Sequence, residues 1–138
     1  MLLLGERQVR VALEAADEAG ADLKIALIHH PFDWLRPFDR RDCEAMLLDN
    51  CHFILHGHLH HMAITHLKSP DSSAMVIAGG ACYETREHPN SYNFVQLDFS
   101  LHKGTIYLRR YSNERGGFWA PDTLLYKDVP AGEQEFLL

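Results

Sequence analysis

Two short apolar runs, each ending in histidine, do most to constrain the fold of this chain. Residues 24–29 and 53–56 are apolar almost throughout and are bounded by turn signals, a pattern typical of strands that are covered on both faces. Pro31 ends the first run because proline cannot donate a hydrogen bond to a sheet, and Gly57 ends the second. Both runs are therefore predicted to be short buried strands with histidines at their carboxyl ends.

A helix-forming segment precedes each of these strands. Residues 5–19 are rich in Ala, Glu, Leu and Arg, with Val9 and Leu13 on one apolar stripe, and Gly20 is a suitable stop. Residues 40–48 are predicted to form a second helix, with Asp39 as its N-cap.

The second half of the chain favours extended structure. Its last two strand-like segments are joined by a short loop, which predicts a hairpin. The four strand-like segments are residues 63–68, 74–78, 92–99 and 105–111. The order of elements predicts an α/β fold in which a mixed sheet is followed by antiparallel strands. We place one domain over residues 1–112 and an irregular C-terminal tail over residues 113–138.

The composition narrows the classes of partner. The formal net charge is −6 over 138 residues, which argues against sequence-independent nucleic-acid binding, because that binding needs basic side chains to replace phosphate counterions.

Three cysteines lack the spacing of a metal or disulfide framework, so we predict reduced, mostly buried thiols, with Cys82 in the core. The first leucines are followed at once by Gly5-Glu6-Arg7, and no apolar run could span a membrane. We expect a cytoplasmic protein without a membrane partner.

Histidine is the unusual residue of the composition. Ten histidines are present, five of them between residues 52 and 61, and His29-His30 form a pair upstream. Ligands of open α/β sheets bind at the carboxyl ends of the strands, so imidazoles at two such ends are expected to converge. Gly57 should let the chain turn sharply and approach an ion closely. Neutral imidazole binds zinc and also suits iron, manganese or nickel, so the pattern indicates a metal site.

These motifs resemble the last two motifs of the calcineurin-like metallophosphoesterases, a group that includes purple acid phosphatases and cyclic-nucleotide phosphodiesterases. In that family a lone histidine after a strand, often in His-x-Pro, is followed by Gly-His-x-His. Here His29-His30-Pro31 and Gly57-His58-Leu59-His60 are similar to that pair, with a helix between them. The resemblance covers residues 5–111 and implies the C-terminal half of a metallophosphatase-type α/β/β/α sandwich.

The resemblance also implies roles for individual residues. His29 and His58 would bind one divalent ion, and His60 would bind a second. Two such ions (Mn, Fe, Zn or Ni) about 3.5–4 Å apart would clamp the phosphoryl oxygens while a metal-bound hydroxide attacks phosphorus. The implied activity is hydrolysis of a phosphomonoester or phosphodiester, with a small phosphorylated molecule favoured over nucleic acid as substrate.

The chain departs from the family at its beginning. Family members start with Asp-x-His, Gly-Asp and Gly-Asn-His followed by an acidic residue, and none of these motifs occurs here. We therefore interpret residues 1–112 as the C-terminal part of a metallophosphoesterase domain. By itself this part is expected to be inactive and to hold at most one weakly bound ion, because the carboxylate that bridges the two metals is missing. Exposed strand edges should favour a homodimer or an N-terminal half supplied in trans.

Other assignments stay open at this stage. His30 could face the substrate or support a ligand from behind. Arg36 could pair with phosphate through its planar guanidinium, although a solvated loop arginine is equally consistent with the sequence. Asp33 and Trp34 are candidates for the wall of the substrate pocket. The alternative function is a non-catalytic module that derives from the same fold and binds a metal or a partner.

Overall fold

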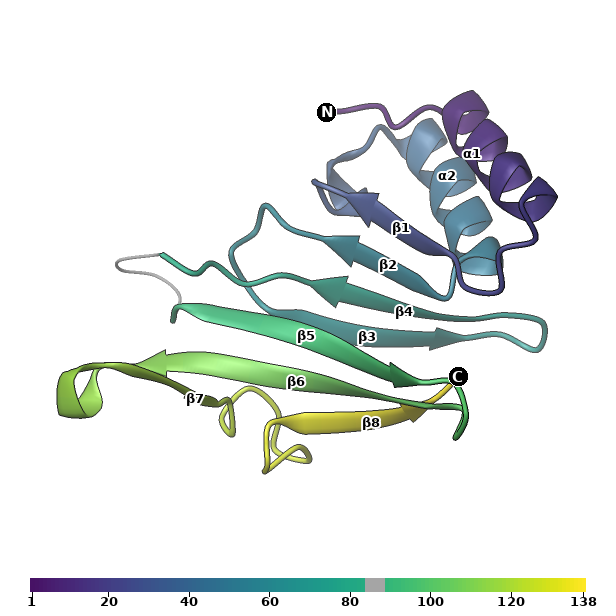
Figure 1. The fold of residues 1–138 in the computed structure, drawn as a ribbon. Coiled ribbons are helices and arrows are strands. Elements are labelled where there is room, and N and C mark those ends of the chain that lie inside the picture. The colour runs from purple at the N-terminus through teal and green to yellow at the C-terminus, as the bar shows by residue number, and fades with distance from the viewer. Residues whose placement is uncertain (84–88) are drawn as a thin grey trace. The chain divides into compact units, whose positions relative to one another are not determined.

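The computed structural model of the protein describes residues 1–83 and 89–138, and His88, which we predict to be a surface residue, lies outside them. The chain is mixed α/β, as the sequence predicts, with two α-helices and two sheets among the described residues (Figure 1). The helices are α1 (Glu6–Glu18) and α2 (Pro37–Asn50). The strands are β1 (Ile25–Ile28), β2 (Phe53–His56), β3 (Ala63–Lys68), β4 (Ser73–Ala78), β5 (Ser91–Asp98), β6 (Lys103–Ser112), β7 (Phe118–Pro121) and β8 (Glu133–Leu137). Two short 3-10 turns, η1 (Phe32–Trp34) and η2 (Glu114–Gly116), complete the list.

The chain divides into two compact units. The first unit comprises Met1–Leu59 and Ala63–Ala78 and contains both helices and a sheet of order β1-β2-β4-β3. The first three strands of that order are parallel, and β3 pairs with β4 in the antiparallel sense, so the sheet is mixed as predicted. Parallel pairing of β1 with β2 brings the carboxyl ends of these two strands to the same edge.

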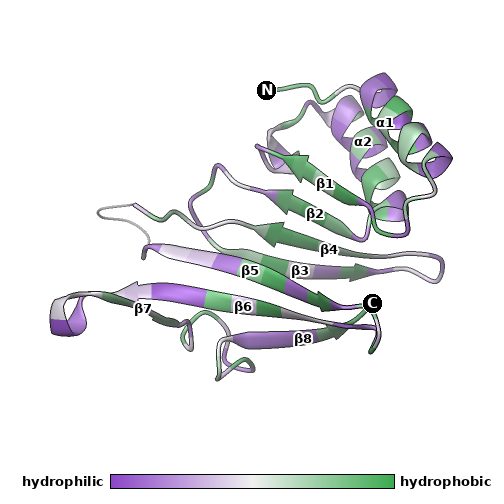
Figure 2. Cartoon of the chain, viewed as in Figure 1, coloured by the Kyte–Doolittle hydropathy of each residue, from purple (hydrophilic) through white to green (hydrophobic). Residues whose placement is uncertain are grey.

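The core of the first unit lies between the helices and one face of this sheet. Cys43 of α2 and Ile54 of β2 are fully buried, and Val9 of α1 is 6% exposed. Ala26 and Ile28 of β1 pack against the same cluster. Apolar residues follow β1, β2 and β4 along most of their length (Figure 2), as expected for a parallel sheet covered by helices.

Coverage of β1 differs from the prediction. We expect this strand to be covered on both faces, but Ile25 is 47% exposed and Leu27 is 76% exposed. The reason is its place in the sheet, because β1 is first in the strand order and pairs only with β2 among the described residues. An open apolar groove of about 560 Å³ runs along β1 and α1, with Leu27 and Ala12 among its lining residues.

Helix α1 begins and ends close to the prediction, and Gly20 follows it with φ 65°, a left-handed conformation that glycine adopts without strain.

Helix α2 starts earlier than predicted, since Pro37 takes its first position, where a missing N–H costs nothing. Asp39 is therefore not the N-cap, and that prediction is wrong. Its carboxylate is 4% exposed and accepts hydrogen bonds from the backbone N–H groups of Leu4 (2.6 Å) and Gly5 (2.9 Å). It thus joins the two helix starts.

The second unit comprises His60–Met62 and Gly79–Leu138, with an antiparallel sheet built on β6. The predicted hairpin is present as β5 and β6, paired from Ser91↔Arg110 to Asp98↔Lys103. The other edge of β6 pairs with β7 and β8. Residues 113–138, for which the sequence predicts irregular structure, therefore contain two strands.

The cysteines fall into two classes. Cys43 and Cys51 are buried free thiols, as predicted, whereas Cys82 is exposed, so the prediction that it lies in the core is wrong. Burial is the main reason that the pKa of the Cys43 thiol rises to about 11, and Asp39 beside it adds to the effect. Among the residues that the structure describes, neither helix is long and apolar enough to cross a bilayer.

Candidate metal centre

The candidate centre begins where β1 and β2 end. In the parallel register Ile28 lies beside His56, so His29 and Gly57 are the next residues along the two strands. The backbone N–H of Gly57 donates a hydrogen bond of 3.1 Å to the carbonyl oxygen of His29. This bond holds the two chain segments together at the point where both leave the sheet.

The backbone then turns sharply at His58. The N–H of Leu59 donates to the carbonyl oxygen of Gly57 (2.9 Å), which closes a three-residue turn around His58. His58 has φ 69°, a left-handed conformation that is uncommon for residues other than glycine. The chain does turn sharply next to Gly57, as we expect, but the positive φ belongs to His58 and Gly57 is not among the residues with positive φ. Strain of this kind gathers at functional sites.

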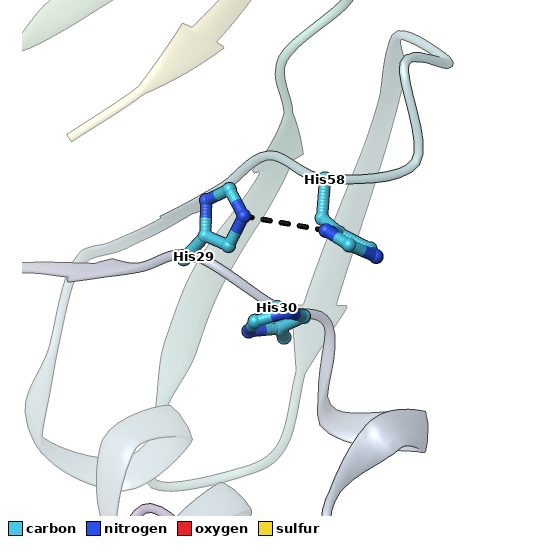
Figure 3. A group of neighbouring side chains, drawn as sticks. All are labelled: His29, His30 and His58. Atoms are coloured by element: carbon cyan, nitrogen blue, oxygen red, sulfur yellow. Dashed lines mark hydrogen bonds between the residues drawn. The ribbon is translucent and has the colours of Figure 1, made fainter. Parts of the chain in front are cut away.

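Three imidazoles meet above these strand ends, as Figure 3 shows. His58 Nδ1 lies 3.2 Å from His29 Nε2, and the ring of His30 lies beside both. Ring centroids are 4.5 Å apart for His29 and His30, and 4.3 Å apart for His30 and His58. One ligand nitrogen from each residue lies within 4.8 Å of the other two, an arrangement that could hold a metal ion.

The shortest of these distances has a chemical meaning. Two imidazole nitrogens 3.2 Å apart must have a proton between them or bind a common cation, since two bare lone pairs repel. Nitrogens bound at about 2.0–2.1 Å to a tetrahedral zinc ion lie about 3.3 Å apart. The separation of His29 Nε2 and His58 Nδ1 therefore fits a shared metal ion without rearrangement.

Trp34 of η1 contacts the group from one side. Its indole stacks on the His30 ring at a centroid distance of 5.5 Å and meets the His58 ring edge-to-face at 4.3 Å. Trp34 is 44% exposed, so the part of its side chain that does not contact these rings or the rest of the protein faces solvent. Partial burial, followed by the charges of His58 and then His29, lowers the pKa of His30. The environment therefore favours a neutral His30 ring, the form in which imidazole binds metals.

The other predicted residues have varied positions. Arg36 is exposed and takes the N-cap position of α2, so its role with phosphate stays a prediction. Asp33 forms a salt bridge with Arg40, which directs its carboxylate to α2. His60 is exposed, has φ 55° and belongs to the second unit, and the group of three does not include it. Its role as a ligand also stays a prediction.

Two further histidines have structural roles in the first unit. His52 Nδ1 accepts a hydrogen bond from the backbone N–H of Lys24 (3.2 Å) and so ties the starts of β1 and β2, a role that sequence reasoning misses. His56, which we expect to be structural because it precedes Gly57 within the strand, has its Nδ1 3.3 Å from the carbonyl oxygen of Gly57. The predicted surface histidines His61, His66 and His102 are exposed.

Comparison with known proteins does not identify a family. No family model, no curated protein and no solved structure matches this chain. The case for a function therefore rests on the geometry of the imidazole group and on the motifs that carry it.

Proposed function

We propose that this chain carries the histidine side of a metal-dependent phosphoesterase site and that its sheets belong to a metallophosphatase-type α/β/β/α sandwich. The observation that supports the proposal best is the convergence of His29 and His58. These residues follow two parallel strands at the same sheet edge, and their ring nitrogens are 3.2 Å apart. This is where an open α/β sheet places a ligand, and imidazole suits Zn, Mn, Fe or Ni.

The chain's own residues have distinct tasks in this proposal. His29 and His58 hold one divalent ion, and His60 is assigned to a second one. A bound ion supplies Lewis-acid chemistry, because it lowers the pKa of water and neutralises negative charge on phosphoryl oxygens. Arg36 is available to pair with a phosphate oxygen, since it lies two residues after η1 at an exposed position.

One feature of the group favours the second candidate function, a non-catalytic metal-binding module. Among the described residues, the group offers three imidazoles and no carboxylate. Hydrolysis through two ions needs a bridging anionic ligand, so this chain alone is expected to hold one ion and to turn over phosphate esters slowly if at all. The substrate class proposed for the complete site is a small phosphomonoester or phosphodiester.

The test combines metal content with hydrolysis. The purified chain is loaded with Mn²⁺ or Zn²⁺, and turnover of an aryl phosphodiester and an aryl phosphomonoester is followed by release of the phenolate. The proposal expects His58→Ala to abolish both metal retention and any turnover. His66→Ala is the matched control, since His66 is an exposed histidine of the same unit that pairs with Ser73 outside the group. Metal retention without turnover by the wild-type chain would favour the non-catalytic module.

A further inference from the structure

We propose that His30 is a metal ligand, so that one divalent ion binds to the three imidazoles of His29, His30 and His58, with Trp34 holding the rings of His30 and His58 in place. The inference rests on the metal part of the proposed function but not on phosphoester hydrolysis. It also departs from the family resemblance, which assigns no ligand role to the second histidine of the His-His-Pro motif.

The first argument is the direction of the side chains. Consecutive residues of a strand point to opposite faces, so His29 and His30 would be separated if β1 continued through them. The strand ends at Ile28, and the next two residues form a bend. Both rings therefore reach the same place, at a centroid distance of 4.5 Å and an interplanar angle of 88°. The proline that follows supports this end, since it disfavours helical backbone at residue 30.

The second argument is the fit of the three nitrogens to an ion. All three pairs of ligand nitrogens lie within 4.8 Å, and His29 Nε2 and His58 Nδ1 are 3.2 Å apart. The imidazole rings turn about terminal torsions with broad energy wells, so their nitrogens can adjust to an ion that binds them at about 2.0–2.1 Å. Three histidines are an established ligand set for zinc sites that keep one position open. The ligand class is therefore a borderline divalent cation such as Zn²⁺ or Co²⁺, and Mg²⁺ and Ca²⁺, which need oxygen ligands, are excluded.

The third argument is the support from Trp34. Its indole contacts two of the three rings, one by stacking at 5.5 Å and one edge-to-face at 4.3 Å. Residues that lie behind metal ligands orient them, and their loss typically reduces metal affinity about 10- to 100-fold. Trp34 is thus a positioning residue. It is also a spectroscopic reporter, because an ion bound to His30 and His58 lies next to the indole.

The experiment uses this reporter in the full chain. The protein has two tryptophans, and Trp119→Phe leaves Trp34 as the single emitter while keeping an aromatic ring against Tyr92 and Tyr111. Co²⁺ is titrated at pH 7.5 while Trp34 fluorescence is recorded. Binding at the site should quench the emission in a saturable way, and an excess of Zn²⁺, which takes the site without quenching, should restore it.

Variants in this background separate the possible ligands. His30→Phe removes the ligand nitrogens but keeps a ring that can stack on Trp34, so it should weaken Co²⁺ binding by more than about tenfold. His29→Ala should weaken binding at least as much. The control His66→Ala should leave the dissociation constant within about twofold of wild type, because His66 lies outside the group of three. His30→Asn serves as a second variant if His30→Phe does not give the wild-type far-UV circular dichroism spectrum.

The outcomes distinguish this inference from the proposed function. Loss of Co²⁺ affinity in His30→Phe with retention in His66→Ala supports the three-imidazole site, whether or not the loaded chain hydrolyses any phosphate ester. Wild-type affinity in both His30→Phe and His30→Asn overturns the inference and leaves the phosphoesterase proposal standing. Absence of saturable quenching in the parent protein overturns the inference as well.

Discussion

The left-handed backbone at His58 should make this position more stable with glycine than with alanine. A left-handed conformation costs an L-residue roughly 1–2 kcal/mol. Glycine escapes that cost but loses about 0.5–1 kcal/mol more backbone entropy on folding. With φ 69° at His58, we therefore expect His58→Gly to exceed His58→Ala in free energy of unfolding by about 0.5–1 kcal/mol. Both variants remove the imidazole and its ring contacts, so the difference between them isolates the backbone.

Equilibrium unfolding in urea, in the presence of EDTA, measures this difference. A second pair, His30→Gly and His30→Ala, is the matched control, because His30 lies in the same group of rings and is not among the residues with positive φ. At that position the order should reverse, with alanine more stable by about 0.5–1 kcal/mol. If His58→Ala proves as stable as His58→Gly while the control pair behaves as expected, the turn at His58 is not strained and the reasoning fails.

Four further predictions concern the first unit and the thiols. Asp39→Ala leaves two backbone N–H groups without their buried carboxylate, so urea unfolding should show a loss of about 1–3 kcal/mol. At pH 8, Ellman's reagent should modify the exposed Cys82 rapidly, whereas the buried Cys43, with its pKa raised to about 11, and Cys51 should react only after unfolding. Because the fold favours the neutral Cys43 thiol, its contribution to stability should be constant below about pH 9 and decline between pH 9 and about 11. Leu27→Lys puts a charge on the exposed face of β1 and should reduce self-association in sedimentation velocity, with a change in stability of less than about 0.5 kcal/mol.

Local pattern is enough to predict the central elements of the fold. Strands β2 and β3 have the predicted bounds, and the β5–β6 hairpin follows from alternating residues around a short loop. The length of an apolar run and the turn residues at its ends do not determine how many neighbouring strands it pairs with. The exposed face of β1 could therefore not be predicted from the sequence. Strands β7 and β8 lack a strong pattern of their own and depend on the long second edge of β6.

The candidate site was predictable to the level of strand ends but not of single torsions. His29 and His58 were expected together because their motifs end two neighbouring strands, and the structure places them 3.2 Å apart. The position of His30 depends on whether β1 stops before or after residue 29, and a shift of one residue would send its ring to the other face. Sequence reasoning could therefore only leave its role open. It also assigned the turn to Gly57, since glycine is the usual left-handed residue, whereas His58 adopts that conformation.

The strain at His58 lies within the site for which we propose a bound ion. A histidine in left-handed backbone is less favourable by roughly 1–2 kcal/mol than it would be in an ordinary conformation, and the ring nitrogens of His29 and His58 lie only 3.2 Å apart. A ligand that binds only the folded chain contributes about 2.7 kcal/mol when its concentration is 100 times its dissociation constant. A divalent ion at His29, His30 and His58 would thus offset the strain at His58 and would replace the proton that His29 and His58 otherwise share. The same two features would have no compensation in a chain that binds nothing at this edge of the sheet.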